Sequence, residues 1–141
     1  TRIGAEQELC IIDKNYRPAP LGPEILKKAN HPNLVTEFAK FNAEINLTPR
    51  EFTKTCLSDM EAEVTSLIEV FRNAAKGFNV EPILVGILPT IRKFDINMEN
   101  LTPMERYFAL CTAINKLRKH IEQDIDVSEE DARRIAREAF E

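Results

Sequence analysis

The chain has 141 residues, of which 43% are hydrophobic and 30% are charged. This length is typical of one domain and is sufficient for a hydrophobic core. Its 23 acidic and 19 basic residues give a net charge of −4, which argues against a nucleic-acid-binding protein, because such proteins are usually basic. No apolar run approaches the roughly 20 residues of a membrane span, so we expect a soluble protein of the cytoplasm.

Both ends of the sequence resemble cuts within a longer protein. The chain begins at Thr1 and not at a methionine, and it enters strand-like sequence without a signal peptide. It closes at Glu141 within a helical pattern. We therefore expect this chain to be a piece of a larger protein.

The three cysteines, Cys10, Cys56 and Cys111, are far apart in the sequence. Their odd number and wide spacing support neither a disulfide framework nor a zinc site. Each lies in an apolar or amphipathic run, so we expect three reduced thiols in the core.

The first two predicted strands follow from the period-two alternation of apolar and polar residues. Residues 3–12 alternate with mixed faces, and residues 40–47 alternate more regularly, with the apolar residues at odd positions. Between them, a proline-rich connector leads into a short helix over residues 23–29, which Asn30-His31-Pro32 ends.

A long helix and a further strand are predicted next. Ser58 and Glu61 have capping-box spacing, and an apolar stripe at helical spacing follows them as far as Gly77. The apolar run over residues 81–89 is typical of a strand that is buried on both faces.

The last third of the chain is predicted to be helical. Thr102 and Glu105 form another capping box in front of an amphipathic helix. Residues 119–127 read as a polar link, and a last amphipathic helix is expected over residues 128–140. Together the elements predict an α+β fold in which an antiparallel sheet is flanked by helices.

Carboxylates on the first two strands are the main chemical signal. Glu6 and Glu8 are two residues apart, so they project from one face of a strand. Glu44 lies on the polar side of the second strand, between Asn42 and Asn46. If the strands are neighbours, three carboxylates share one face, where Mg²⁺ or another hard cation would offset their repulsion. The alternative, which the spacing alone favours, is a solvated strand face that carries acids without binding metal.

Several sequence blocks occur in the order of a known enzyme family. The block Gly4-Ala5-Glu6-Gln7-Glu8-Leu9 has a G-x-E-x-E pattern, and residues 41–49 contain an E-x-N strand that ends in proline. Gly86-Ile87-Leu88-Pro89-Thr90 forms a third block, and residues 102–107 begin the helix after it. Together these blocks resemble the glutamate–cysteine ligase family of carboxylate–amine ligases over about residues 1–118. The resemblance favours metal binding over a merely solvated face.

The resemblance implies a glutamine-synthetase-like fold, in which a curved antiparallel sheet forms an active-site funnel. It implies an enzyme that uses ATP and Mg²⁺ to phosphorylate a carboxylate, usually the γ-carboxylate of glutamate. An amine, typically that of cysteine, then attacks the acyl phosphate, as in glutathione biosynthesis. Carried over by motif, Glu6, Glu8 and Glu44 are expected to be Mg²⁺ ligands, which agrees with the importance of charge neutralisation in phosphoryl transfer.

Three residues next to these blocks are candidate substrate contacts, namely Asn46, Thr90 and Arg92. For Arg92 the alternative is a solvated loop charge, because Lys93 follows it in the same polar stretch. The sequence assigns a catalytic role to none of the residues.

Residues 119–141 depart from the family pattern. The family has further strands with Arg, His and Gln side chains that hold ATP, and no such block or glycine-rich phosphate loop occurs here. We therefore expect residues 1–118 to be the N-terminal portion of a catalytic domain. This portion is expected to be inactive without the rest of the domain. The alternative is a non-catalytic domain of the same origin that binds a metal or an amino acid, or that mediates an interaction. Neither nucleic acid nor a membrane is an expected partner, and a homo-oligomer is compatible with the sequence.

Overall fold

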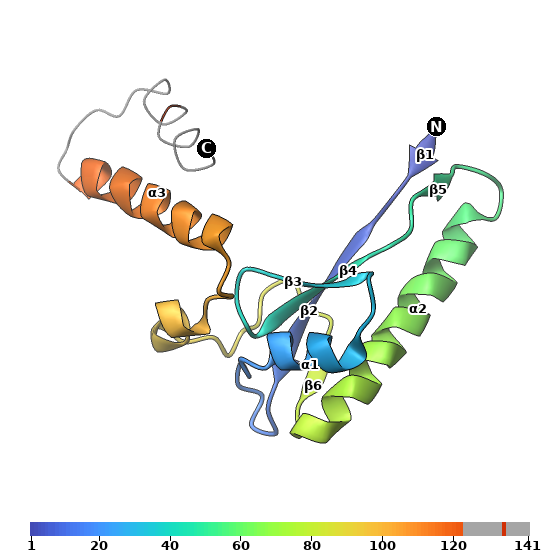
Figure 1. Cartoon of the computed structure of the whole chain (residues 1–141), viewed down its shortest axis with the longest axis horizontal. Helices are drawn as coiled ribbons and strands as arrows, with labels where there is room; N and C mark the ends of the chain where they lie inside the picture. Colours follow the sequence, from blue (N-terminus) through green and yellow to red (C-terminus); the bar gives the residue numbers. More distant parts are fainter. Residues whose placement is uncertain (123–133, 135–141) are drawn as a thin grey trace. The chain divides into compact units, whose positions relative to one another are not determined.

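The computed structural model describes residues 1–122 and residue 134, and these form a mixed α+β structure with antiparallel sheets (Figure 1). The strands are β1 (Arg2–Ile3), β2 (Glu6–Ile12), β3 (Leu34–Thr36), β4 (Asn42–Asn46), β5 (Arg50–Glu51) and β6 (Glu81–Ile83). The α-helices are α1 (Gly22–Ala29), α2 (Cys56–Ala75) and α3 (Glu105–Glu122), with short 3₁₀ segments η1 (Lys76–Phe78), η2 (Lys93–Asp95) and η3 (Met98–Asn100). The chain packs as two compact units that divide after Thr102. The α+β class that the sequence predicts is confirmed.

A four-stranded antiparallel sheet forms the centre of the first unit, with strand order β3-β4-β2-β6. β2 and β4 are the two strands predicted from alternation, and they pair from Glu6 opposite Asn46 to Cys10 opposite Asn42. β3 extends the sheet beside β4, and β6 extends it beside β2. The first two predicted strands are therefore neighbours, which is the condition under which their carboxylates share one face.

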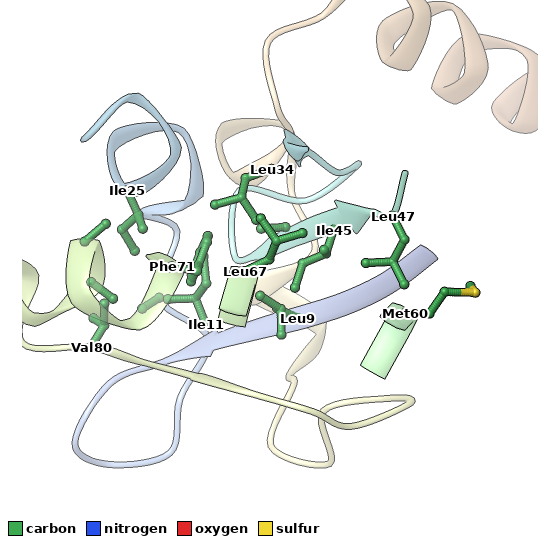
Figure 2. Close-up of a cluster of buried hydrophobic side chains, with 14 residues drawn as sticks. Leu9, Ile11, Ile25, Leu34, Ile45, Leu47, Met60, Leu67, Phe71 and Val80 are labelled. Carbon is green, nitrogen blue, oxygen red and sulfur yellow. The ribbon is translucent and has the colours of Figure 1, made fainter. Parts of the chain in front are cut away.

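One face of this sheet packs against α1 and α2 and forms the main core (Figure 2). Leu9 and Ile11 of β2 point to this face together with Ala43 and Ile45 of β4, and each is at most 1% exposed. Phe71 of α2 is fully buried against them. Because strand side chains alternate, the residues between these positions point away from the helices.

β1 and β5 form a separate two-stranded ribbon that continues the β2–β4 pair with a shifted register. Arg2 lies opposite Glu51, whereas a continuation of the Glu6–Asn46 register would place Arg2 opposite Arg50. The segment between β4 and β5 therefore contains one extra residue, as in a β-bulge.

Glu63 of α2 connects this ribbon to the helix. Its carboxylate accepts hydrogen bonds from the Thr48 hydroxyl at 2.7 Å and from the Thr48 N–H at 3.1 Å, and it pairs with the Arg50 guanidinium. These partners, the Thr48 hydroxyl foremost, lower the pKa of Glu63 in spite of partial burial. Because the pKa is lower in the folded chain than in the unfolded one, the stabilisation is present above the ordinary glutamate pKa. It is lost as the pH falls through the lowered value.

Glu63→Gln is expected to reduce the free energy of unfolding by about 1 kcal/mol near neutral pH, because it removes a charged acceptor. The difference from the original chain should shrink as the pH falls from neutral through the lowered pKa of Glu63, because the glutamate then also becomes neutral. Urea unfolding across this pH range measures the effect. Glu61→Gln, at an exposed position of the same helix, is the matched control and should leave stability unchanged. A loss that persists undiminished in acid would contradict a role for the ionised carboxylate.

Residues 81–89 are not the doubly buried strand that their apolar run predicts. Only β6 is a strand, and it pairs with β2 alone at the edge of the sheet. Leu84 is 51% exposed and Ile87 is 83% exposed. The physical reason is that Pro82 lacks an N–H and an edge strand is paired on one side only, so a long strand is not supported.

Both predicted capping boxes are wrong. α2 begins before Ser58, and its N-cap residue Thr55 makes no side-chain capping hydrogen bond. α3 begins only at Glu105, while the Thr102 hydroxyl donates to the backbone carbonyl of Glu37 in the first unit. A tertiary contact therefore occupies the hydroxyl that the local pattern assigned to the helix end.

α3 continues through residues 119–122, where the sequence predicts the start of a polar link. Ile114, an apolar residue of the helix that the sequence predicts to be amphipathic, is 50% exposed. The rest of the predicted link and the helix expected over residues 128–140 lie outside the described residues, apart from residue 134. Within the described part of the chain, the helices are too short or too polar to cross a membrane. The domain boundary after residue 118 stays a prediction.

Candidate functional site

The sheet face that points away from the helices carries the predicted carboxylates. Glu8 and Glu44 are direct partners in the β2–β4 pair, and Glu6 lies opposite Asn46. Directly opposed side chains in antiparallel strands have Cβ atoms about 4.5–5.5 Å apart. We call these four residues the acid face. The structure thus brings the three predicted Mg²⁺ ligands onto one surface with one candidate substrate contact.

The carboxylate of Glu44 lies in surroundings that disfavour its charge. Partial burial raises its pKa, and the carboxylates of Glu6, Glu37 and Glu8 raise it further. The Asn46 side-chain amide donates a hydrogen bond to Oε1 of Glu44 at 2.9 Å, which acts in the opposite direction. The net effect is a raised pKa, so a cation at this face would relieve repulsion between its carboxylates.

Glu37 is a fourth carboxylate near this face, and the sequence reasoning missed it. It follows β3, which pairs with β4 so that Val35 lies opposite Glu44. Its Oε1 accepts a hydrogen bond from the Phe38 N–H at 2.9 Å. The signal was the two-residue spacing between Val35 and Glu37, which places both on the Glu44 side once residues 34–36 are known to pair with β4.

The acid face ends where the same side of the sheet becomes apolar. Cys10 and Ile12 continue the even-numbered positions of β2, and they pack with Leu88 in a second buried cluster. Ile83 and Ile91 pack against this cluster. The segment after β6 therefore covers the end of the sheet face that carries Cys10 and Ile12. It does not cover the end that carries the carboxylates.

All three cysteines are free thiols. Cys10 and Cys56 are buried, as expected for thiols in the core, whereas Cys111 is only half-buried. Burial, with a smaller contribution from the charge of Glu8, raises the pKa of the Cys10 thiol. A raised pKa keeps this thiol protonated and makes it a poor nucleophile.

The acid face offers the kind of donor that Mg²⁺ prefers, namely carboxylate and amide oxygens. Among the described residues, the buried Oδ1 of Asn42 has no hydrogen-bond partner, and Asn42 shares the Glu44 side of β4. No three His, Cys, Asp or Glu side chains of the described residues are grouped closely enough to hold a metal ion. The oxygen donors of the acid face are thus of the type that Mg²⁺ prefers, and they lie on one side of the sheet. Their carboxylates are nevertheless too far apart in this structure to form a coordination shell.

The structure does not bring Thr90 and Arg92 to the acid face. The Thr90 hydroxyl donates to the backbone carbonyl of Tyr16, and the Thr90 carbonyl accepts a hydrogen bond from the Arg17 guanidinium at 3.0 Å. Tyr16 and Arg17 follow the end of β2 that lies about 20 Å along the strand from Glu6. Arg92 is exposed, which agrees with a solvated loop charge.

The chain matches no protein-family model, and neither a curated protein nor a solved structure is significantly similar to it. The likeness to glutamate–cysteine ligases therefore depends on the sequence blocks at residues 4–9, 41–49, 86–90 and 102–107. The activity that this likeness implies is a proposal.

Proposed function

We propose that this chain forms part of an ATP- and Mg²⁺-dependent ligase that joins the γ-carboxylate of glutamate to an amine such as that of cysteine. The observation that carries the proposal is the β2–β4 register, which puts Glu8 opposite Glu44 with Glu6 on the same face. Phosphoryl transfer depends mainly on positioning and charge neutralisation. A surface of carboxylates that holds a cation is therefore a suitable part of such a site.

In the proposed reaction, a carboxylate oxygen of the substrate attacks the γ-phosphorus of ATP, and ADP leaves. The amine nitrogen then attacks the carbonyl carbon of the acyl phosphate, and an amide forms as phosphate leaves and the nitrogen loses a proton. When bound, Mg²⁺ supplies positive charge to the phosphate oxygens. Glu6, Glu8 and Glu44 would hold this cation, and the Asn46 amide would keep the Glu44 carboxylate oriented through its hydrogen bond.

The proposal includes the architecture of the parent enzyme. The four-stranded sheet would belong to a larger curved sheet of the glutamine-synthetase type, with residues 1–118 as the N-terminal portion of a cytoplasmic catalytic domain. The basic residues that hold ATP would then come from outside this chain. Thr90 and Arg92 stay predicted substrate contacts.

The alternative is a non-catalytic domain of the same origin that binds a divalent cation or an amino acid, or that mediates an interaction. The positions of Thr90 and Arg92 favour it, because two of the three candidate substrate contacts lie away from the acid face. If this domain binds a cation, the acid-face carboxylates bind it and the protein does not hydrolyse ATP.

Assays of the full-length protein distinguish the two functions. With ATP, MgCl₂ and glutamate present, cysteine should raise ADP formation well above the rate without an amine, and a panel of amino acids identifies the preferred acceptor. Chelation of Mg²⁺ by EDTA should abolish the reaction. If none of the carboxylate–amine pairs stimulates ADP formation while Mn²⁺ still broadens the NMR signals of β2 and β4, the non-catalytic alternative is correct.

A further inference from the structure

A groove of about 1010 Å³ opens at the end of β2 that is remote from Glu6. Its walls come from the turn after β2, from the C-terminal end of α2 with η1, and from the start of β6, which lie close together at the bottom of Figure 1. A groove of this volume accommodates a small organic ligand. None of the acid-face residues lines it.

Tyr16 is presented to this groove by a strained turn. Its φ of 59° lies in the left-handed region, which is rare for a bulky residue. The turn is held by a hydrogen bond from the Tyr16 N–H to the Asp13 carbonyl at 2.9 Å, and the Asp13 carboxylate accepts from the Asn15 and Arg17 N–H groups at 2.8 and 2.9 Å. The Thr90 hydroxyl donates to the Tyr16 carbonyl. Although the backbone is fixed in this way, Tyr16 is 69% exposed, so its ring is available to a ligand.

The groove also carries cations. Lys14, Arg72 and Lys76 line it, against the acids Asp13 and Glu81. Arg72 forms an ion pair with Glu69 of the same helix. Lys76 Nζ donates a hydrogen bond to the neutral side-chain amide of Asn73. Lys14 forms no ion pair with another described residue. Lys14 and Lys76 are therefore the cations of the groove that are not paired with a carboxylate among the described residues, and an anionic ligand would meet them beside Asp13 and Glu81.

We propose that this groove binds an aromatic anion of the nucleoside-phosphate class. The base stacks on the Tyr16 ring, and the phosphate lies between the ammonium groups of Lys14 and Lys76. A tyrosine ring offers a stacking surface to any nucleobase, and lysine binds phosphate as a point charge. The site is distinct from the acid face, because Glu8 and Ile12 are about 13 Å apart along β2, and it requires no divalent cation.

Titration of AMP into the 141-residue chain in the presence of EDTA tests the proposal, with adenosine and inorganic phosphate as partial ligands. AMP should bind more tightly than either of them. Tyr16→Asn should weaken AMP binding about tenfold, as the loss of a stacking surface does, and Tyr16→Phe should retain it. The double variant Lys14→Gln, Lys76→Gln should also weaken binding and remove most of its dependence on salt.

Tyr16→Asn also separates binding from folding. Asparagine adopts the left-handed conformation more readily than tyrosine, so this variant should melt at the same temperature as the original chain or higher. A lower melting temperature would show that Tyr16 serves the fold and would overturn the proposal. Phosphate alone binding as tightly as AMP, or AMP binding equally well to Tyr16→Asn, would overturn it too. Glu44→Gln should leave AMP affinity unchanged, so this proposal and the ligase function can fail separately.

Discussion

Replacing Glu44 with glutamine is expected to remove divalent-cation binding from the acid face and to lower ATP-dependent phosphate release by the full-length protein about 100-fold or more. Glutamine keeps an oxygen that can accept the hydrogen bond from Asn46, but it lacks the charge that attracts a cation. Groups that only orient a metal ligand contribute about 10–100-fold to affinity or activity, so a direct ligand should contribute at least as much. Phosphate release with glutamate and cysteine, and broadening of β2 and β4 amide signals by Mn²⁺, measure the two effects.

The same substitution should stabilise the fold when metal is absent. Burial and neighbouring carboxylates raise the pKa of Glu44, so the folded chain binds its proton more tightly than the unfolded chain does. Stability therefore falls as the pH rises from the ordinary glutamate pKa to the raised value, and it stays reduced above it. The melting temperature of Glu44→Gln should exceed that of the original chain near neutral pH and should approach it below about pH 4.

Glu61→Gln is the matched control, because Glu61 is exposed on α2 and does not belong to the sheet. It should change neither phosphate release nor the melting temperature. Unchanged phosphate release by Glu44→Gln would remove the acid face from the proposed mechanism. A lower melting temperature of Glu44→Gln at neutral pH would contradict the raised pKa of this carboxyl.

Truncation of Phe71 to alanine is expected to reduce the free energy of unfolding by about 3–5 kcal/mol. Phe71 is fully buried in the core where α2 packs on the sheet (Figure 2). A loss of this size is a large part of the roughly 5–15 kcal/mol that stabilises a typical domain. Urea unfolding followed by circular dichroism measures it.

Phe52→Ala is the matched control, since it removes the same atoms from a side chain that is 60% exposed. Its effect should stay within about 0.5 kcal/mol. Phe71→Leu should cost less than Phe71→Ala and gives a measurable value if the alanine variant does not fold. Equal losses at Phe71 and Phe52 would contradict the position of the core.

Local alternation was sufficient to predict which side chains of β2 and β4 share a face. Ala43 and Ile45 are buried and Glu44 points the other way because the strand period is two. The register that places Glu8 opposite Glu44 could not be predicted in this way, since it depends on how the connection through α1 and β3 returns the chain to the sheet. The side on which each strand carries its carboxylates was therefore predictable within that strand, and the pairing that brings the two sets together was not.

Features that depend on distant contacts were beyond local patterns. The local pattern predicts Thr102 to be a helix cap, but its hydroxyl donates a hydrogen bond to the backbone carbonyl of Glu37, 65 residues earlier. Leu84 and Ile87 are apolar, yet they are exposed in the segment that follows the short edge strand β6. Glu37 influences Glu44 only because β3 pairs with β4. In each case the sequence contains the residue, but only the tertiary fold determines its neighbours.

The extra residue between β4 and β5 determines which side of the sheet Arg50 occupies. In an unbroken strand, Arg50 would share the side of Glu44 and Asn46, because all three positions are even-numbered. With the extra residue, the Arg50 guanidinium meets Glu63 of α2 instead. Deletion of one residue from segment 47–49 would return this arginine to the carboxylates as an internal counter-ion. The bulge thus keeps the acid face from neutralising itself and leaves its charge available to a cation from solution.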